Sequence, residues 1–360
     1  MQRTNKFKYP SINGLRAISI VLVLIYHLNL KSHILSGISD IKWLHSIVYF
    51  IQDGHLGVNV FFVISGFLIT SLLLQEEANS GKISIKYFYT RRMLRIFPAY
   101  YFLLLVYFLL QLFHVIHISN ASWITSITYT KYFNWKFDWL TAHTWSLSVE
   151  EQFYLFWPLV FCCGKNFRKY ITFGLLIIVP IIRIYISINP IDWINEWTFF
   201  TRIDAIATGC LFAFYKDTII EKFKQYWTPI FYFSTCSLFF LRYFPLLAQK
   251  IGLEFLFIPL GKTHGTLANF LIAIIMLYSI FGPQKIWFRF LNLKAVNYIG
   301  ILSYSIYLWQ QLFISSSGFW MTQFPVNMVF IFLAAWFSYS FIEKPFLKMK
   351  ETIAEKRKKF

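Results

Sequence analysis

The sequence has 360 residues, of which 57% are hydrophobic, 21% are aromatic and only 14% are charged, and its mean hydropathy is +0.54. A water-soluble domain needs more polar surface than this, so the composition excludes a soluble protein. Repeated apolar stretches of about 17–23 residues can each cross a hydrocarbon layer about 30 Å thick. They predict an all-α fold, a polytopic transmembrane helical bundle.

The apolar stretches predict about ten spans. They cover Ile12–Leu30, His55–Gln75, Ile96–His117, Trp145–Cys162, Ile171–Ile188, Phe199–Tyr215, Trp227–Tyr243, His264–Gly282, Asn297–Ser317 and Pro325–Glu343. The connections are too short for a soluble domain, so we predict one transmembrane domain over residues 1–346 and a basic cytoplasmic tail over residues 347–360. The first apolar run is too long for a cleavable signal peptide, and none is expected.

The net charge of +18 reflects 34 basic and 16 acidic residues. With the N-terminus in the cytoplasm, 24 basic residues fall on that side of the membrane and only seven fall outside. The outer seven are Lys31, Lys42, Lys131, Lys136, Arg242, Lys250 and Lys262, and the spans hold Arg16, Arg183 and Arg202. The positive-inside rule therefore predicts both termini in the cytoplasm. The basic character is explained by membrane orientation, so we expect no nucleic-acid partner.

The four cysteines lie in or beside apolar runs and lack the spacing of metal ligands. They are Cys162, Cys163, Cys210 and Cys236. We interpret them as small hydrophobic residues and expect no metal site.

The first span, "GLRAISIVLVLIYH" (Gly14–His27), contains an arginine and a histidine. Arg16 and His27 are eleven residues apart, about three helical turns, so they share one face about 16 Å apart along the axis. An arginine at the start of a span can be an interfacial anchor, and a histidine can be structural. Ionisable groups inside spans usually face a bundle interior or a water-filled cavity, so the shared face favours a functional site.

A basic cluster, "RRMLRIFPAYY" (Arg91–Tyr101), stands at the cytoplasmic entrance of the third span. A helix would gather Arg91, Arg92 and Arg95 on one side. Guanidinium groups bind phosphates bidentately, so the cluster is a candidate phosphate site. A positive-inside signal is the alternative.

The segment "TWSLSVEEQFYLFWPL" (Thr144–Leu159) places Glu150 and Glu151 inside a span, where a carboxylate is costly. Adjacent helical residues point about 100° apart, so the two cannot serve one point together. One glutamate would face a cavity, and the other would pair with a cation such as Arg183 or Arg202. A purely structural ion pair is the alternative.

Three further patterns add polar groups. Arg202 and Asp204 are two residues apart and cannot face each other on a helix, so we expect their partners on other helices. Close packing through small residues explains "GVNVFFVISGFLIT" (residues 57–70). In "LSYSIYLWQQ" (residues 302–311), Tyr304, Tyr307 and Gln310 repeat every three residues and predict a polar stripe.

Six segments in this order resemble the acyltransferase-3 family of membrane O-acyltransferases. They are "GLRAISIVLVLIYH", "GVNVFFVISGFLIT", "RRMLRIFPAYY", "TWSLSVEEQFYLFWPL", "YSIYLWQQ" and "FIEKPF". The resemblance runs from Tyr9 to about Phe346. It implies about ten spans and the transfer of an acyl group, most often acetyl, from cytoplasmic acyl-coenzyme A (acyl-CoA) to a hydroxyl of an external glycan.

By position, the family's basic residue and histidine of the first span fall on Arg16 and His27, and its paired arginines fall on Arg92 and Arg95. Asn59 stands where many members have aspartate. Gln310 stands where many have histidine, so we do not expect an essential base there. Many relatives carry an extracytoplasmic hydrolase-like domain. This sequence instead resembles shorter members that modify lipopolysaccharide O-antigen or exopolysaccharide, and this resemblance implies a location in the inner (cytoplasmic) membrane.

Acyl transfer to a hydroxyl needs a base and a group that stabilises the oxyanion. We expect His27 to be the base, with an acyl-His27 intermediate as the second route. Glu150 or Glu151 would orient the imidazole. Arg92 and Arg95, together with Arg16, would hold the phosphates of acyl-CoA, and a glycan or lipid-linked glycan would be the acceptor.

Two other functions fit a membrane protein with buried charges. One is a transporter of a glycan, lipid or anion, although the sequence shows no inverted repeat and no pair of interrupted spans. The other is an acyl relay that passes the group to a separate outer enzyme. Consumption of acetyl-CoA by the purified protein distinguishes a transporter from the other two.

Overall fold

The computed structural model describes residues 9–32, 34–35, 45–133, 138–191, 194–195, 197–250, 257–315 and 318–358. Within these residues the regular structure is helical, apart from one isolated β-bridge between Ile191 and Ile194. The predicted all-α fold is therefore confirmed for this part of the chain. Predictions that rest on Arg3, Lys6, Lys8, Lys42, Lys136, Ser317 and Lys359 fall outside the described residues.

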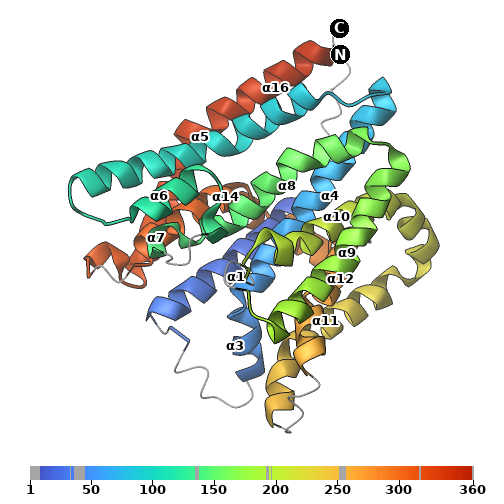
Figure 1. Ribbon diagram of the computed structural model, residues 1–360, viewed down its shortest axis with the longest axis horizontal. Helices are drawn as coiled ribbons and strands as arrows, with labels where there is room; N and C mark the ends of the chain where they lie inside the picture. The colour runs from blue at the N-terminus through green and yellow to red at the C-terminus, as the bar shows by residue number, and fades with distance from the viewer. Residues whose placement is uncertain are drawn as a thin grey trace.

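The helices follow one another in a single series (Figure 1). They are α1 (Ile12–Ser32), α3 (His45–Ile51), α4 (Gly54–Ser80), α5 (Ile85–Leu112), α6 (Asn120–Ile127), α7 (Trp139–Ala142), α8 (Thr144–Cys162), α9 (Lys165–Ile188), α10 (Phe199–Phe223), α11 (Trp227–Lys250), α12 (Phe257–Phe281), α13 (Ile286–Leu291), α14 (Lys294–Phe313), α15 (Val326–Phe337) and α16 (Lys344–Lys358). Short 3₁₀ turns are η1 (Lys131–Phe133), η2 (Lys224–Tyr226) and η4 (Trp320–Thr322), and η5 (Ser338–Glu343) is a π-helical turn. Each of the ten predicted spans overlaps one of these helices.

Five described stretches are long and apolar enough to cross a membrane. They are α1, α4, α5, α9 and the stretch Val326–Glu355. They support a multi-pass membrane protein, while the count of ten spans and the cytoplasmic termini stay predictions. Helices α8 and α14 are about as long, with 19 and 20 residues, but they bury polar side chains in the bundle.

Helix α4 lies in the middle of the bundle, against α1 on one side and α10 on the other, and α1 also packs on α14. Glycines make the crossing of α4 and α10 close. A Cβ atom at Gly66 would collide with the carbonyl oxygen of Ile206, and one at Gly209 would collide with that of Val63. The interpretation of residues 57–70 as a small-residue packing surface is confirmed.

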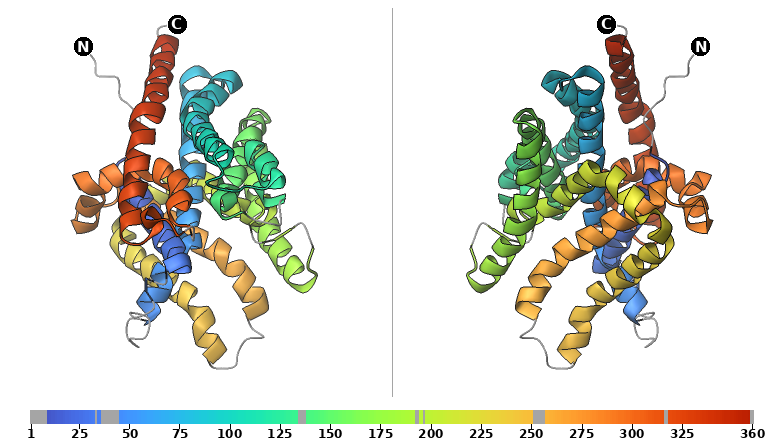
Figure 2. Two further views of the ribbon diagram at one scale, coloured as in Figure 1. Left: turned by 90° about the vertical axis from the view of Figure 1, so that its left-hand side faces the viewer. Right: turned by 90° about the vertical axis from the view of Figure 1, so that its right-hand side faces the viewer.

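The C-terminal helix α16 packs along α5, as Figures 1 and 2 both show. The π-helical turn η5 joins it to α15 and holds the buried Glu343, which accepts a hydrogen bond from the Ser305 hydroxyl of α14. Most of the predicted basic tail thus belongs to a helix in contact with the bundle. The division between residues 346 and 347 stays a prediction.

Candidate functional site

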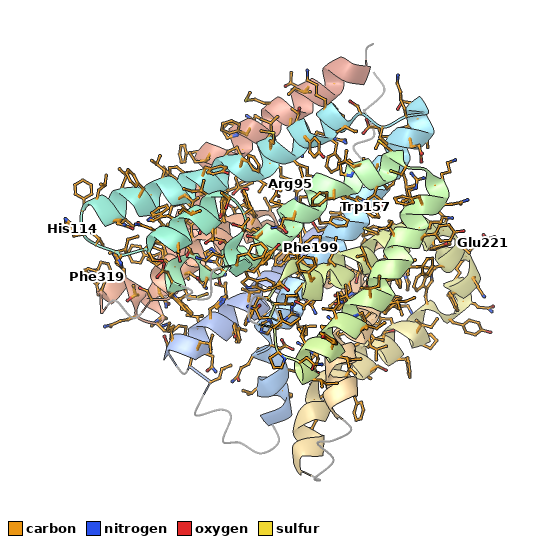
Figure 3. All side chains as sticks on the ribbon, in the orientation of Figure 1. Arg95, His114, Trp157, Phe199, Glu221 and Phe319 are labelled. Carbon is orange, nitrogen blue, oxygen red and sulfur yellow. The ribbon has the colours of Figure 1, made fainter. Side chains whose placement is uncertain are left out.

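A cavity of about 730 Å³ lies between α1, α4, α5, α8, α14 and α16. Its lining is rich in cations: Arg16, Arg91, Arg92, Arg95 and Lys350. Three carboxylates also line it: Glu76, Glu150 and Glu351. Arg95 lies on the stretch of α5 that runs beside α16 (Figure 3). Tertiary packing therefore brings the sequence-predicted Arg16 to the predicted arginine cluster, with Glu150 in the same cavity.

The arginines of α5 are held differently from one another. Arg91 donates to Glu76 Oε2 at 3.1 Å and lies 4.2 Å from the centre of the Tyr87 ring. Arg92 lies 4.9 Å from the ring centre of Tyr154, a cation–π contact.

Arg16, Arg92 and Arg95 take part in none of the ion pairs found among the described residues. All three are half-buried. Glu150 is a single carboxylate in the same cavity and cannot balance three half-buried cations. The excess of positive charge therefore favours binding of an anion, and guanidinium groups match phosphate best.

The two adjacent glutamates have different surroundings, as predicted. Glu150 lines the cavity, beside Ser65 and Tyr154, which hydrogen-bond to each other. Glu151 does not line the cavity, and its Oε1 is buried without a hydrogen-bond partner in the described part of the structure.

Two expectations for these glutamates are wrong. Neither carboxylate hydrogen-bonds to His27, because Gln310 occupies that position. Neither pairs with Arg183, which donates to Asp204 Oδ2 at 2.8 Å instead.

The ion pair of Arg183 and Asp204 joins α9 to α10 and confirms that Asp204 finds its partner on another helix. Arg202 lies 5.8 Å from the ring centre of Trp145.

His27 is oriented by an amide. Its Nδ1 lies 3.1 Å from Oε1 of Gln310, and its Nε2 lies 3.5 Å from Nε2 of Gln311. An amide oxygen only accepts and an amide nitrogen only donates, so Nδ1 carries the proton and Nε2 carries the lone pair. The half-buried imidazole therefore presents Nε2 as a base.

The orientation of the Gln311 amide is determined by His143. The backbone N–H of His143 donates to Oε1 of Gln311 at 3.4 Å, and its Nδ1 lies 3.0 Å from the same oxygen. A backbone N–H can only donate, so the atom facing it must be the oxygen. The Gln311 nitrogen consequently faces His27. His143 is only 2% exposed, and its Nε2 has no hydrogen-bond partner among the described residues.

Hydrogen bonds connect this group to the cavity. Ser146 and Tyr307 line the cavity, and their hydroxyls lie 2.7 Å apart. The Tyr307 hydroxyl also donates to the carbonyl oxygen of His143 at 2.6 Å. Tyr304 and Tyr307 line the cavity and Gln310 contacts His27, so the predicted polar stripe of α14 is confirmed. His27 itself does not line the cavity and lies beyond its Tyr307 end.

The segment before α8 is anchored by a buried lysine. Lys131 Nζ donates to Thr141 Oγ1 at 2.6 Å, and its backbone N–H donates to Ser148 Oγ at 3.3 Å. Burial lowers the pKa of Lys131 to about 8. These contacts hold α7 next to His27, where the Trp139 indole lies 5.8 Å from the imidazole and donates to the carbonyl oxygen of Gln311 at 3.2 Å.

A second, polar cavity of about 590 Å³ lies at the other end of α1. Its lining comprises Lys31, Ser32, Ile34, Ser315, Gly318, Thr322, Gln323 and Phe324. Lys31 Nζ lies 4.3 Å from the centre of the Trp139 ring. His27 thus lies along α1 between Arg16 of the charged cavity and Lys31 of the polar cavity.

Sequence reasoning missed His143, Gln311 and Lys350. His143 directly precedes the glutamate segment and Gln311 directly follows Gln310, so both stood beside quoted motifs. Lys350 was grouped with the other basic residues of the tail. In the described part of the chain, no three His, Cys, Asp or Glu side chains come together as a metal site requires.

The comparisons with known proteins show the family of the chain. The acyltransferase domain family named acyltransferase-3 matches residues 9–342. The chain is similar to the O-acetyltransferase OatA of Staphylococcus aureus strain NCTC 8325, with 30% identity over 94% of this chain and 57% of that protein. It is also similar to SACOL0978 of S. aureus strain COL, provisionally named an O-acetyltransferase, with 31% identity over 95% of this chain and 58% of that protein. The chain thus spans less than two thirds of these relatives. No solved structure matches.

Proposed function

The chain belongs to the acyltransferase-3 family and is a membrane acyltransferase, and we propose that it moves an acetyl group from cytoplasmic acetyl-CoA to a hydroxyl of a cell-surface glycan. One observation carries this proposal. Arg16, Arg92 and Arg95, which form no ion pair in the described part of the chain, line the charged cavity. Hydrogen bonds through Tyr307, His143 and Gln311 connect this cavity to His27, whose Nε2 is a base. The names of the relatives, both O-acetyltransferases, support acetyl as the group transferred.

Acetyl-CoA suits the charged cavity in size and charge. Ligand cavities commonly measure about 300–1,000 Å³, and this one measures about 730 Å³. The donor carries a diphosphate, which would bind to Arg92 and Arg95, with Arg16 deeper in the cavity, and a 3′-phosphate on its ribose. Its flexible pantetheine arm would then carry the thioester toward Tyr307 and His27.

The residues around His27 can account for each proton and bond in the transfer. Nε2 takes the proton of the glycan hydroxyl while the hydroxyl oxygen attacks the thioester carbonyl. The C–S bond breaks, and the CoA thiolate receives the proton from the imidazolium, which leaves an ester and a free thiol. The Gln311 amide, directed at the same place, is a neutral donor for the developing oxyanion. In the second route, Nε2 attacks the carbonyl itself and forms acyl-His27 before the glycan accepts the group.

The polar cavity beside Lys31 supports an acceptor that arrives from the other side of the membrane. Its hydroxyl and amide side chains, which include Ser32, Thr322 and Gln323, match the hydroxyls of a sugar. Trp139, between Lys31 and His27, offers a ring face against which a sugar can pack. We propose O-antigen or exopolysaccharide as the acceptor, a lipid-linked glycan as its form, and the inner membrane as the location.

Two measurements test the proposal. The purified chain is incubated with acetyl-CoA and an extract of lipid-linked glycan, and release of free CoA and of acetylated glycan is followed. In parallel, surface glycan is compared by mass spectrometry between deletion cells and cells complemented with wild type or His27→Gln. We expect CoA release and ester formation together, restored only by wild type. No CoA release would indicate a transporter, and release without ester would indicate a relay to another protein.

A further inference from the structure

The C-terminal helix α16 forms one wall of the charged cavity. Lys350, Glu351 and Ala354 line it, across from α4 and α5. Figures 1 and 2 show α16 alongside α5 over much of its length. A tail that served only as a cytoplasmic charge signal would not need to line a cavity, so this helix has a more specific role.

Lys350 differs from its neighbours on α16. Lys344 and Lys348 are exposed, whereas Lys350 is half-buried and points into the cavity. It takes part in none of the ion pairs found among the described residues. The charges of Arg91, Arg92 and Arg95 repel it, and the charge of Glu351 acts in the opposite direction. A cation placed among three others is stabilised when an anion binds between them.

The position of Lys350 in the cavity indicates which part of the donor it meets. Arg16, Ser146 and Tyr307 line the end that connects to His27. Lys350 instead has the α5 arginines as its charged neighbours, and the lining also includes Asn79 and Ser80, from the last turn of α4. A donor whose thioester is directed toward His27 leaves its adenosine in the part of the cavity farther from Tyr307. The 3′-phosphate is attached to the ribose of that adenosine.

We infer that Lys350 binds the 3′-phosphate of the acyl-CoA donor, so that α16 is part of the donor site. This inference rests on the proposed function. The arginines of α5 remain for the diphosphate. Arg95 lies about one helical turn beyond Arg91 on α5, next to the lining residue Ile96. The enzyme would then select the 3′-phosphorylated nucleotide through a residue outside the segments that identify the family.

The test compares two donors and two lysines in the purified full chain. Dissociation constants are measured for acetyl-CoA and for 3′-dephospho-acetyl-CoA, with wild type, Lys350→Ala and Lys348→Ala. Lys348→Ala is the matched control because it removes the same charge from the same helix at an exposed position. We expect Lys350→Ala to weaken acetyl-CoA binding about 10-fold and to leave binding of the dephospho donor unchanged. Lys348→Ala should change neither, and Lys350→Arg should retain most of the affinity.

Other outcomes overturn the inference. If Lys350→Ala weakens binding of both donors equally, the side chain binds the diphosphate. If it weakens binding of neither donor, Lys350 is not part of the donor site. Failure of the proposed function is distinguishable, because wild type would then bind neither donor. If Arg92→Ala weakens both donors while Lys350→Ala weakens neither, the donor site stands and only the role of Lys350 is wrong.

Discussion

The charged cavity and the surroundings of His27 are joined by hydrogen bonds, but the cavity is lined by charged side chains and His27 is surrounded by neutral ones. In the cavity, Arg16, Arg92, Arg95 and Lys350 face open space. Around His27, the partners are the neutral amides of Gln310 and Gln311 and the rings of Tyr26 and Trp139. Charges act over several ångströms and are screened by salt, whereas a tautomer is set by single hydrogen bonds. Donor binding and proton transfer should therefore respond to different perturbations.

The largest effect is expected at the neutral site. His27→Gln keeps much of the side chain's shape but cannot take up a proton, so kcat should fall about 10²–10⁴-fold. Acetyl-CoA binding, measured directly, should stay near wild type, since His27 does not line the cavity. His117→Gln, at an exposed position, is the control. A merely structural histidine predicts that Gln is tolerated better than Ala and that lost activity follows lost protein.

The next effect is expected in the cavity. Arg92→Ala or Arg95→Ala removes a charge-assisted contact worth about 1.5–3 kcal/mol, so the dissociation constant of acetyl-CoA should rise about 10–100-fold. Lysine at either position should restore only part of the affinity because it lacks the guanidinium fork. Isothermal titration of the purified variants measures this, with the exposed Arg289→Ala as control. Wild-type affinity in a folded double-alanine variant would exclude this cavity as the donor site.

A smaller loss is expected when the amide behind His27 is removed. Gln310→Leu leaves the Nδ1–H of His27 without its acceptor, at a cost of about 1.4 kcal/mol, so kcat should fall about 10-fold while KM for acetyl-CoA stays constant. Gln310→Glu keeps an acceptor oxygen and should retain more activity than Gln310→Leu. Steady-state kinetics of the two variants, compared at equal protein in the membrane, decide the point. Equal activity of both variants would mean that Gln310 does not orient the imidazole.

The smallest effect is expected from salt. Raising ionic strength from 0.15 to 1 M shortens the Debye length from about 8 to about 3 Å, which screens the cavity's cations. KM for acetyl-CoA should increase about threefold, while kcat at saturating donor should not change, because the groups at His27 are neutral. Initial rates across donor concentrations at both salts test this. A fall in kcat as large as the rise in KM would contradict the separation of the two regions.

The sequence by itself determined the helices and the local groupings on them. Apolar length predicts helices because each helix satisfies its backbone hydrogen bonds internally, whatever its neighbours are. The spacing of Arg92 and Arg95, and of Arg16 and His27, is likewise set by the geometry of one helix. The polar stripe of Tyr304, Tyr307 and Gln310 was predictable for the same reason.

Only the tertiary structure decided which of these helices meet. His27 meets Gln310 across 283 positions of the chain, and it was this contact, not a glutamate, that determined the tautomer. Lys350 lies at the end of the chain and reaches the arginines of α5 only because α16 packs along that helix. The reason is that periodicity specifies which face of a helix is polar, whereas the partner of that face depends on the packing of the whole bundle.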